Sequence, residues 1–231
     1  MNIKYYLNNA SQSIVTASLI IALLGATFFI VEPSVGQAIT SGPFTIKQTI
    51  TDEISFTTNA VNVTMYGDLQ GITGGTANGS TTVVVKTNNI TGYEMTIAFA
   101  ENGTVQTMKG DVSGDSGIRD YPAVAGEPDY LFSTASTASV FAYTIDAADE
   151  LDIDPSFIDD GADCNQAGTF TLGNCWMEPA TTTFKIIDRA GSASTGATST
   201  VYFRVHVPNN PNPALEEDTY TATATLTAVT T

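Results

Sequence analysis

The sequence predicts an all-β protein, an antiparallel β-sandwich of the Ig-like or jelly-roll kind, preceded by one N-terminal hydrophobic helix. Three observations predict it. Apolar and polar residues alternate with a period of two in about nine short segments after residue 38. Gly, Asn and Pro residues separate these segments, as expected for strands joined by turns. No stretch after residue 38 has the 3.6-residue periodicity of a helix longer than two turns.

The N-terminal helix is predicted from residues 14–31, an apolar run interrupted only by Thr16, Ser18 and Thr27. Its length is at the lower limit for crossing a bilayer. Gly36 and Ala38 are small residues placed as a signal-peptide cleavage site requires. We therefore predict that residues 1–38 are a signal peptide cleaved after Ala38. The alternative is an uncleaved anchor that meets the membrane only through residues 14–31. Both place residues 39–231, one domain, in a secreted or cell-surface location.

The first alternating segment spans residues 44–56, where the even positions are Phe, Ile, Gln, Ile, Asp, Ile and Phe. This pattern predicts one long strand with a bend. Residues 87–92 have the composition of a hairpin turn. Irregular loops are predicted near 101–139 and 146–164, and loops of this length often carry function. The remaining predicted strands, in chain order, are 61–65, 81–85, 93–99, 140–145, 169–172, 183–187, 201–207 and 220–228.

The net charge of the chain is −16. Residues 1–38 contain one Lys and one Glu, so residues 39–231 keep this full charge. They contain no cluster of Lys or Arg, which argues against nucleic-acid partners and against attraction to anionic lipid. Cations, glycans and other proteins are the partners that remain.

Two cysteines, Cys164 and Cys175, are the only ones in the chain. An oxidising compartment favours a disulfide between them. In the chain-entropy model, closing a loop of about 12 residues stabilises a fold by about 3 kcal/mol. A cysteine-based zinc site would need more ligands than these two and the single histidine.

Residues 146–163 are strongly acidic, with eight carboxylates in 18 residues. An EF-hand is excluded because Pro155 replaces the required Gly and Gly161 replaces the bidentate Glu. A solvated acidic loop and an irregular calcium site remain as alternatives, and calcium is the only cofactor considered. The candidate calcium ligands are Asp149, Glu150, Asp152, Asp154, Asp159 and Asp160.

Aromatic residues in or beside the irregular regions suggest a second kind of site. Trp176 and Tyr130 could stack on sugar rings in a binding groove. The alternative is that they form a small core beside the disulfide.

Enzymatic activity is not predicted, and no catalytic residue is assigned. Residues 114–117 match the Gly-Asp-Ser-Gly sequence around the nucleophile of trypsin-like proteases. The single histidine, His206, follows Ser116 by 90 residues, whereas in those proteases the histidine comes first. A secreted hydrolase that uses paired carboxylates remains a third alternative.

Several segments resemble uncharacterised predicted exported proteins of bacteria: Phe44-Thr-Ile-Lys-Gln-Thr-Ile, Thr87-Asn-Asn-Ile-Thr-Gly-Tyr93, Cys175-Trp176 and Asp218-Thr-Tyr-Thr-Ala-Thr-Ala-Thr-Leu-Thr-Ala228. The resemblance implies a secreted β-sandwich and assigns no chemistry. The last of these segments also resembles the terminal strand of Ig-like surface and fimbrial domains.

The function that the sequence favours is a non-enzymatic structural or adhesive protein of the cell surface or of an extracellular assembly. Residues 44–56 follow the predicted cleavage site, so they could add as a strand to a sheet of another copy or of another envelope protein. The alternative is that they form the first strand of their own domain. A glycan- or calcium-binding surface module is the second hypothesis.

Overall fold

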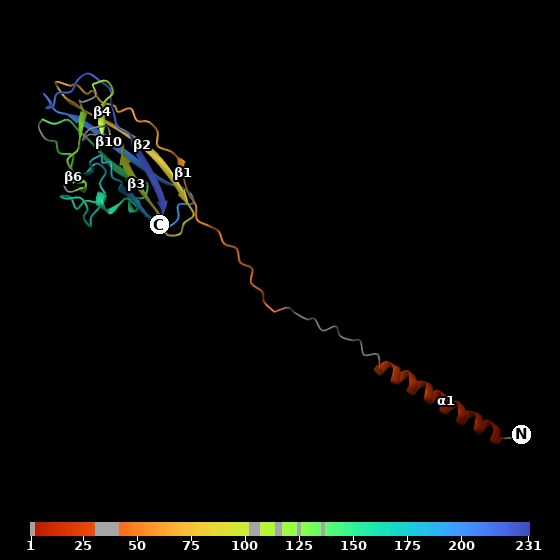
Figure 1. Ribbon diagram of the computed structural model, residues 1–231. Helices are drawn as coiled ribbons and strands as arrows, with labels where there is room; N and C mark the ends of the chain where they lie inside the picture. Colours follow the sequence, from red (N-terminus) through yellow and green to blue (C-terminus); the bar gives the residue numbers. More distant parts are fainter. Residues whose placement is uncertain (1–2, 31–41, 102–106, 114–116, 124–125, 135–136) are drawn as a thin grey trace. The chain divides into compact units, whose positions relative to one another are not determined.

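The computed structural model describes residues 3–30, 42–101, 107–113, 117–123, 126–134 and 137–231. It divides into two compact units, Met1–Thr49 and Ile50–Thr231. The first contains helix α1 (Ile3–Ile30) and residues 42–49, which belong to no helix or strand (Figure 1). Among the described residues, no helical stretch is both long and apolar enough to cross a membrane. The predicted cleavage after Ala38 lies outside the described residues.

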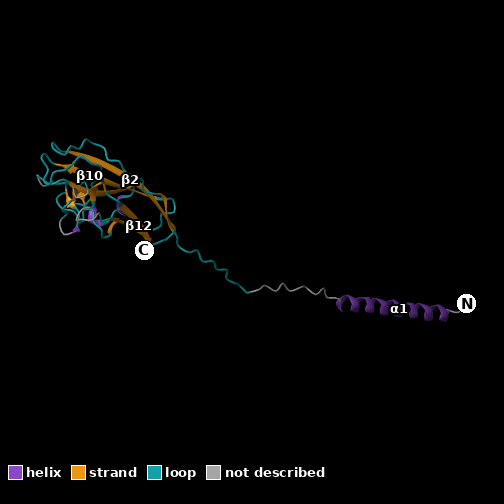
Figure 2. Cartoon of the chain, turned by 45° about the horizontal axis from the view of Figure 1, so that its top comes forward, coloured by secondary structure: helices purple, strands orange, loops and turns teal. Residues whose placement is uncertain are grey.

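The second unit is built mainly of strands (Figure 2). Its largest sheet has the order β1-β2-β10-β7-β5-β4-β11, a second has the order β12-β3-β9, and β6 pairs with β8. All pairs are antiparallel except β5 with β7. The strands are β1 (Ile54–Thr58), β2 (Gly75–Thr87), β3 (Gly92–Phe99), β4 (Met108–Gly110), β5 (Gly117–Asp120), β6 (Asp129–Tyr130), β7 (Val140–Ala147), β8 (Cys175–Trp176), β9 (Phe184–Ala190), β10 (Ala197–Val207), β11 (Tyr220–Thr221) and β12 (Ala224–Thr230).

The longest ladder joins β2 to β10, from the pair Gly75–Val207 to the pair Val85–Ala197. Strand β7 pairs with the other edge of β10. Alternation in β2 follows the sequence pattern, because Val83 and Val85 are buried whereas Thr82 and Lys86 are exposed. The predicted strands at 81–85, 93–99, 140–145, 183–187 and 201–207 are confirmed, with shifts at their ends.

Buried side chains of the two larger sheets pack into one core. The cluster includes Val83 of β2, Met95 of β3, Tyr143 of β7, Ile187 of β9 and Val201 of β10. Each is 1% exposed or less. Full burial of an aliphatic side chain of this size contributes about 1.5–3 kcal/mol relative to exposure, so this shared core holds the sheets together.

Three of the predicted strands are wrong. Residues 44–53 form no strand, and β1 begins only at Ile54. Residues 61–65 also lie outside the ladders, with one isolated bridge at Tyr66. Residues 169–172 contribute only the bridge of Thr169 to Asp159. Alternation shows that a segment can form a strand, but pairing also needs a free neighbouring strand at the right place.

The predicted hairpin turn at residues 87–92 is wrong in a different way. It joins β2 to β3, which belong to different sheets. Gly92 ends this connection with a positive φ of 102°, a conformation that favours glycine. Any Cβ there would also meet the backbone oxygen of Arg189. Composition identified the turn, whereas the choice of sheet depends on distant contacts.

The two regions predicted as irregular loops contain short elements. Strands β4, β5 and β6 lie within 101–139. Residues 146–164 contain two 3₁₀ turns, η2 (Glu150–Asp152) and η3 (Pro155–Phe157). The predicted disulfide between Cys164 and Cys175 is confirmed, with an S–S distance of 2.03 Å, and both residues are buried.

Candidate binding groove

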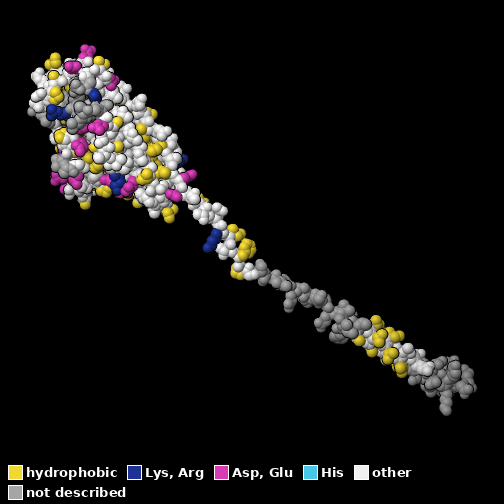
Figure 3. Space-filling model, viewed as in Figure 1, with side chains coloured by type: hydrophobic (Ala, Val, Ile, Leu, Met, Phe, Trp, Pro, Cys, Tyr) yellow, Lys and Arg dark blue, Asp and Glu magenta, His cyan; other side chains and the backbone are white. Residues whose placement is uncertain are grey.

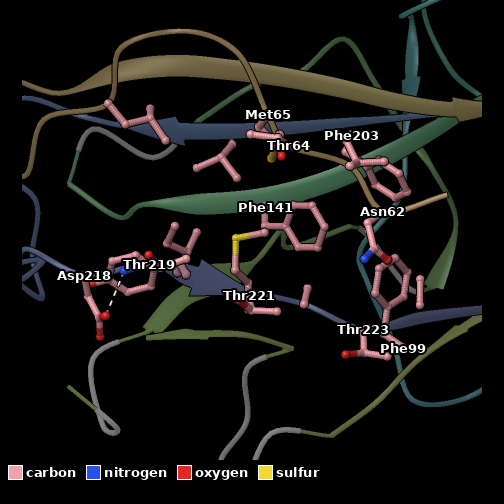
Figure 4. A pocket seen from close by; sticks show the side chains of 18 of the residues that line it. Asn62, Thr64, Met65, Phe99, Phe141, Phe203, Asp218, Thr219, Thr221 and Thr223 are labelled. Carbon is pink, nitrogen blue, oxygen red and sulfur yellow. Dashed lines mark hydrogen bonds between the residues drawn. The ribbon is translucent and has the colours of Figure 1, made fainter. Parts of the chain in front are cut away.

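A groove of about 980 Å³ lies between two segments that are far apart in the sequence. One wall is residues 60–65, the stretch that follows β1, and the other is residues 215–226 around β11 and the start of β12. Figure 4 shows Thr64 and Met65 on one side and Thr221 and Thr223 on the other, with Phe141 between them. The groove therefore begins where the pairing of β1 to β2 has ended at Thr58.

The floor of the groove is apolar and belongs to the core. Phe141 of β7 is 3% exposed and Val201 of β10 is fully buried. The Phe141 ring stacks on Phe203 at 6.1 Å and meets Phe99 edge-on at 5.8 Å. Such aromatic pairs contribute about 0.5–1.5 kcal/mol beyond their burial, so the floor is a firm surface.

The first wall is held on β2 by a few specific contacts. The Val61 amide donates to Thr81 Oγ1 at 2.9 Å. The backbones of Tyr66 and Asn78 exchange two hydrogen bonds of 2.8 and 2.9 Å. Between them, Gly79 leaves room for Val63, because a Cβ on Gly79 would lie 2.5 Å from the Val63 side chain. This wall lies over β2 without continuing its ladder.

The second wall is fixed by Asp218. Its carboxylate accepts hydrogen bonds from the amides of Val112 (2.9 Å) and Ser113 (2.7 Å) and from the Ser113 hydroxyl (2.8 Å). The Thr219 amide donates to its other oxygen at 2.7 Å. These bonds stabilise the charged form and lower the pKa of Asp218 to about 2. Farther along the wall, the Ala100 amide donates to the Thr223 carbonyl at 2.8 Å.

The charges of the groove all have one sign. Among the described residues that line it, the charged side chains are Glu216, Glu217 and Asp218. The same lining contains no His, Cys, Lys or Arg. An apolar floor, threonine-rich walls and an acidic rim suit the binding of an apolar segment that carries positive charge.

The candidate calcium ligands are not brought together. Among the described residues, no group of three or more His, Cys, Asp or Glu is placed to hold a metal ion. Asp149, Asp154, Asp159 and Asp160 each accept a hydrogen bond from a nearby backbone amide. Asp152 and Asp154 also pair with Arg189 and Lys185, and Glu150 is exposed at the start of η2. Calcium binding stays a prediction.

The two candidate sugar-binding aromatics lie on paired strands beside the disulfide. Trp176 is 2% exposed and packs edge-on against Phe132 at 5.3 Å. The Arg204 guanidinium lies 4.3 Å from the centre of the Trp176 ring. Tyr130 is half-buried against the main core. Trp176 therefore belongs to a small core beside the disulfide, which was the alternative to sugar binding.

The protease-like match does not form a site within the described residues. Residues 114–116 lie outside them, and His206 of β10 makes a 3.0 Å contact from Nδ1 to Thr76 Oγ1. No sequence motif indicated the groove, because its two walls, residues 60–65 and 215–226, are about 150 positions apart in the chain. The one available signal was the Gly- and Pro-rich character of residues 67–75 and 208–213, which interrupt the strands beside both walls.

Comparison with known proteins gives no family. No family model matches the chain, and no curated protein matches it.

Proposed function

We propose that this protein is a non-enzymatic structural or adhesive subunit that works outside the cytoplasm, with a β-sandwich that assembles with other copies. The proposed location depends on the apolar residues 14–31 and on the small residues before Ile39. The high net charge of −16 suits a protein that is soluble in that setting.

The observation that carries the proposal is the exposure of residues 42–50. Phe44, Ile46 and Ile50 are 79%, 84% and 84% exposed. Figure 3 shows hydrophobic side chains along the stretch that Figure 1 colours orange. Alternation places all three on one face of an extended chain. Gln48 lies on the same face between Ile46 and Ile50. Three exposed large apolar side chains on one face nevertheless form the kind of patch that marks an interaction site, because leaving them in water forgoes the free energy of burial.

The test is light scattering on residues 39–231 across a concentration series. We expect the mean mass to rise with concentration. A variant with Phe44→Ser, Ile46→Ser and Ile50→Ser should stay monomeric at every concentration. The matched control, Thr45→Ser with Thr49→Ser, changes the opposite face of the same segment and should assemble as the wild type does. A wild-type protein that is monomeric throughout would overturn the proposal and favour a ligand-binding module.

A further inference from the structure

We propose that the groove receives residues 44–50 of a second copy of this chain, which add as a strand alongside β12. The inference rests on the self-assembly proposed above and identifies the surface that carries it.

The acceptor is the outer edge of β12. Among the described residues, β12 pairs only with β3. Strand β1 lies close to β12 but pairs with β2, as far as Val84, and the part of β12 that lines the groove is Ala224 and Leu226. An edge strand offers backbone N–H and C=O groups to an incoming strand. Leu226 of β12 lines the groove and is only half-buried, so an added strand would also complete its burial.

The groove has the shape and surface that one strand needs. Its volume of about 980 Å³ is at the upper end of the roughly 300–1,000 Å³ typical of small-molecule sites. Its floor offers Phe141 and Phe203 to an apolar face. A strand of seven residues is about 23 Å long, and both walls are continuous stretches of chain rather than a closed pocket.

Residues 44–50 match this surface in their alternation. Phe44, Ile46 and Ile50 occupy three of the four even positions, and Thr45, Lys47 and Thr49 occupy the odd ones. In an extended strand the even side chains enter the groove and the odd ones face solvent. Burial of three large apolar side chains in a firm aromatic floor provides the main attraction.

Charge favours the same pairing. Lys47 is the only charged residue in 42–50, and the charged residues that line the groove are Glu216, Glu217 and Asp218. Two chains that each carry −16 repel one another. A contact that brings the one cationic stretch of residues 39–50 to an acidic rim reduces this repulsion and fixes the orientation.

The backbone that follows the segment favours a second copy over a return into the same molecule. The Asn88 side chain donates to the Thr51 carbonyl at 3.0 Å and accepts from the Glu53 amide at 2.8 Å. Thr87 Oγ1 donates to the Glu53 carbonyl at 2.7 Å. These bonds fix Thr51 and Glu53, so a return of the segment into its own molecule would need a turn before Thr51.

The first experiment measures binding of a fluorescent peptide of residues 42–50 to residues 51–231 by anisotropy. The compact unit Ile50–Thr231 holds the whole core cluster, so this part retains its fold. We expect saturable binding. Val61→Arg on the groove wall should weaken it at least tenfold, and Leu151→Arg should leave it unchanged, because Leu151 is 88% exposed and lies away from the groove. A peptide with Lys47→Glu should bind about two- to fivefold more weakly, as for an exposed ion pair. No binding, or equal binding by the Val61→Arg protein, would overturn the groove as the acceptor.

A second experiment separates this inference from the proposed function. Residues 39–231 carrying Thr45→Cys are mixed with the same chain carrying Thr64→Cys under mild oxidation, with Thr182→Cys replacing Thr64→Cys as the control. A covalent heterodimer formed only with Thr64→Cys supports docking between copies. If light scattering shows assembly but the Val61→Arg protein assembles normally and no heterodimer forms, self-assembly is supported and the groove is not its acceptor site. If the peptide binds but the chain stays monomeric, residues 44–50 occupy the groove of their own molecule. The proposal of a second copy in the groove and the proposal of self-assembly are then both overturned.

Discussion

The three-stranded sheet has two edges, and they differ sharply. At the β9 edge the chain covers its own strand: the Asp154 amide donates to the Ile186 carbonyl at 3.1 Å, and Ile153 forms a bridge with Ile187. Phe157 of η3 lies beneath this cover, fully buried, with its ring edge-on to Phe184 at 5.9 Å. At the β12 edge there is a groove instead, and Leu226 remains half-buried.

The charges on the two edges differ as well. Lys185 of β9 contacts the carboxylates of Glu94 at 3.1 Å, Asp154 at 3.4 Å and Asp188 at 2.6 Å. These contacts, led by the hydrogen bond that Lys185 Nζ donates to Asp188, raise the pKa of Lys185. Its side chain is 34% exposed, so each pair contributes little stability and mainly sets where η3 lies. Beside β12, the charged residues that line the groove are all acidic.

The comparison shows two ways to treat a strand edge. A sheet edge must be covered, twisted or paired, because its unpaired backbone N–H and C=O groups can otherwise form hydrogen bonds with another chain. The acidic region that suggested a calcium site serves as the cover of β9. Among the described residues the β12 edge has no comparable hydrogen-bonded cover, although β1 lies close to it. Under the proposal above, it is the edge that a second molecule would use.

The largest expected effect is a difference in stability between the two edges. Phe157→Ala should lower the free energy of unfolding by about 3–5 kcal/mol, because it opens a cavity beneath the cover of β9. Leu226→Ala should cost about 1–2 kcal/mol, since its side chain is only half-buried. Urea unfolding of residues 51–231, which cannot assemble through residues 44–50, measures both. Equal losses would show that the two edges are equally packed.

A smaller effect is expected from the disulfide, which lies on the covered side. Replacing Cys164 and Cys175 together by Ser should lower the free energy of unfolding by about 3 kcal/mol or less. It should leave peptide binding in the groove unchanged, because neither cysteine lines it. Urea unfolding and the anisotropy assay check the two statements. Weaker peptide binding by this variant would mean that the edges are coupled through the core.

The sequence predicted those parts of the fold whose alternation is satisfied inside the molecule. Val83 and Val85, Met95 and Ile97, and Val201 and Val205 all face the core as their period of two requires. The disulfide was predicted because two cysteines in an oxidising compartment have one pairing. The strand prediction for residues 44–53 was wrong because a period of two occurs both in a strand that pairs with a neighbour and in an extended segment that pairs with none.

The candidate site could not be predicted in the same way. Its walls are defined by where strands stop pairing, at Thr58 and again before Ala224. The pair Thr58–Val84 joins residues 26 positions apart and the pair Ala224–Phe99 joins residues 125 positions apart, so neither end can be read from the local sequence pattern. Counting carboxylates along the chain could not show the ion pairs of this region, because Asp152 pairs with Arg189 and Asp154 with Lys185, 37 and 31 positions downstream. Calcium binding itself stays a prediction.

The smallest effect concerns the pH dependence of the groove wall. Hydrogen bonds lower the pKa of Asp218 to about 2, below the ordinary value of about 3.9 for an unfolded chain. Its contribution is therefore fully present above about pH 5 and is lost as the pH falls through about 4 toward 2. Asp218→Asn should lower the melting temperature slightly at pH 6, and the difference from the wild type should shrink as the pH approaches 2. Glu217→Gln, at the exposed neighbouring position, serves as the control and should show no such trend. If the difference between Asp218→Asn and the wild type is the same at pH 6 and pH 2, the hydrogen bonds to the charged carboxylate do not fix this wall, and the β12 edge is shaped by packing alone.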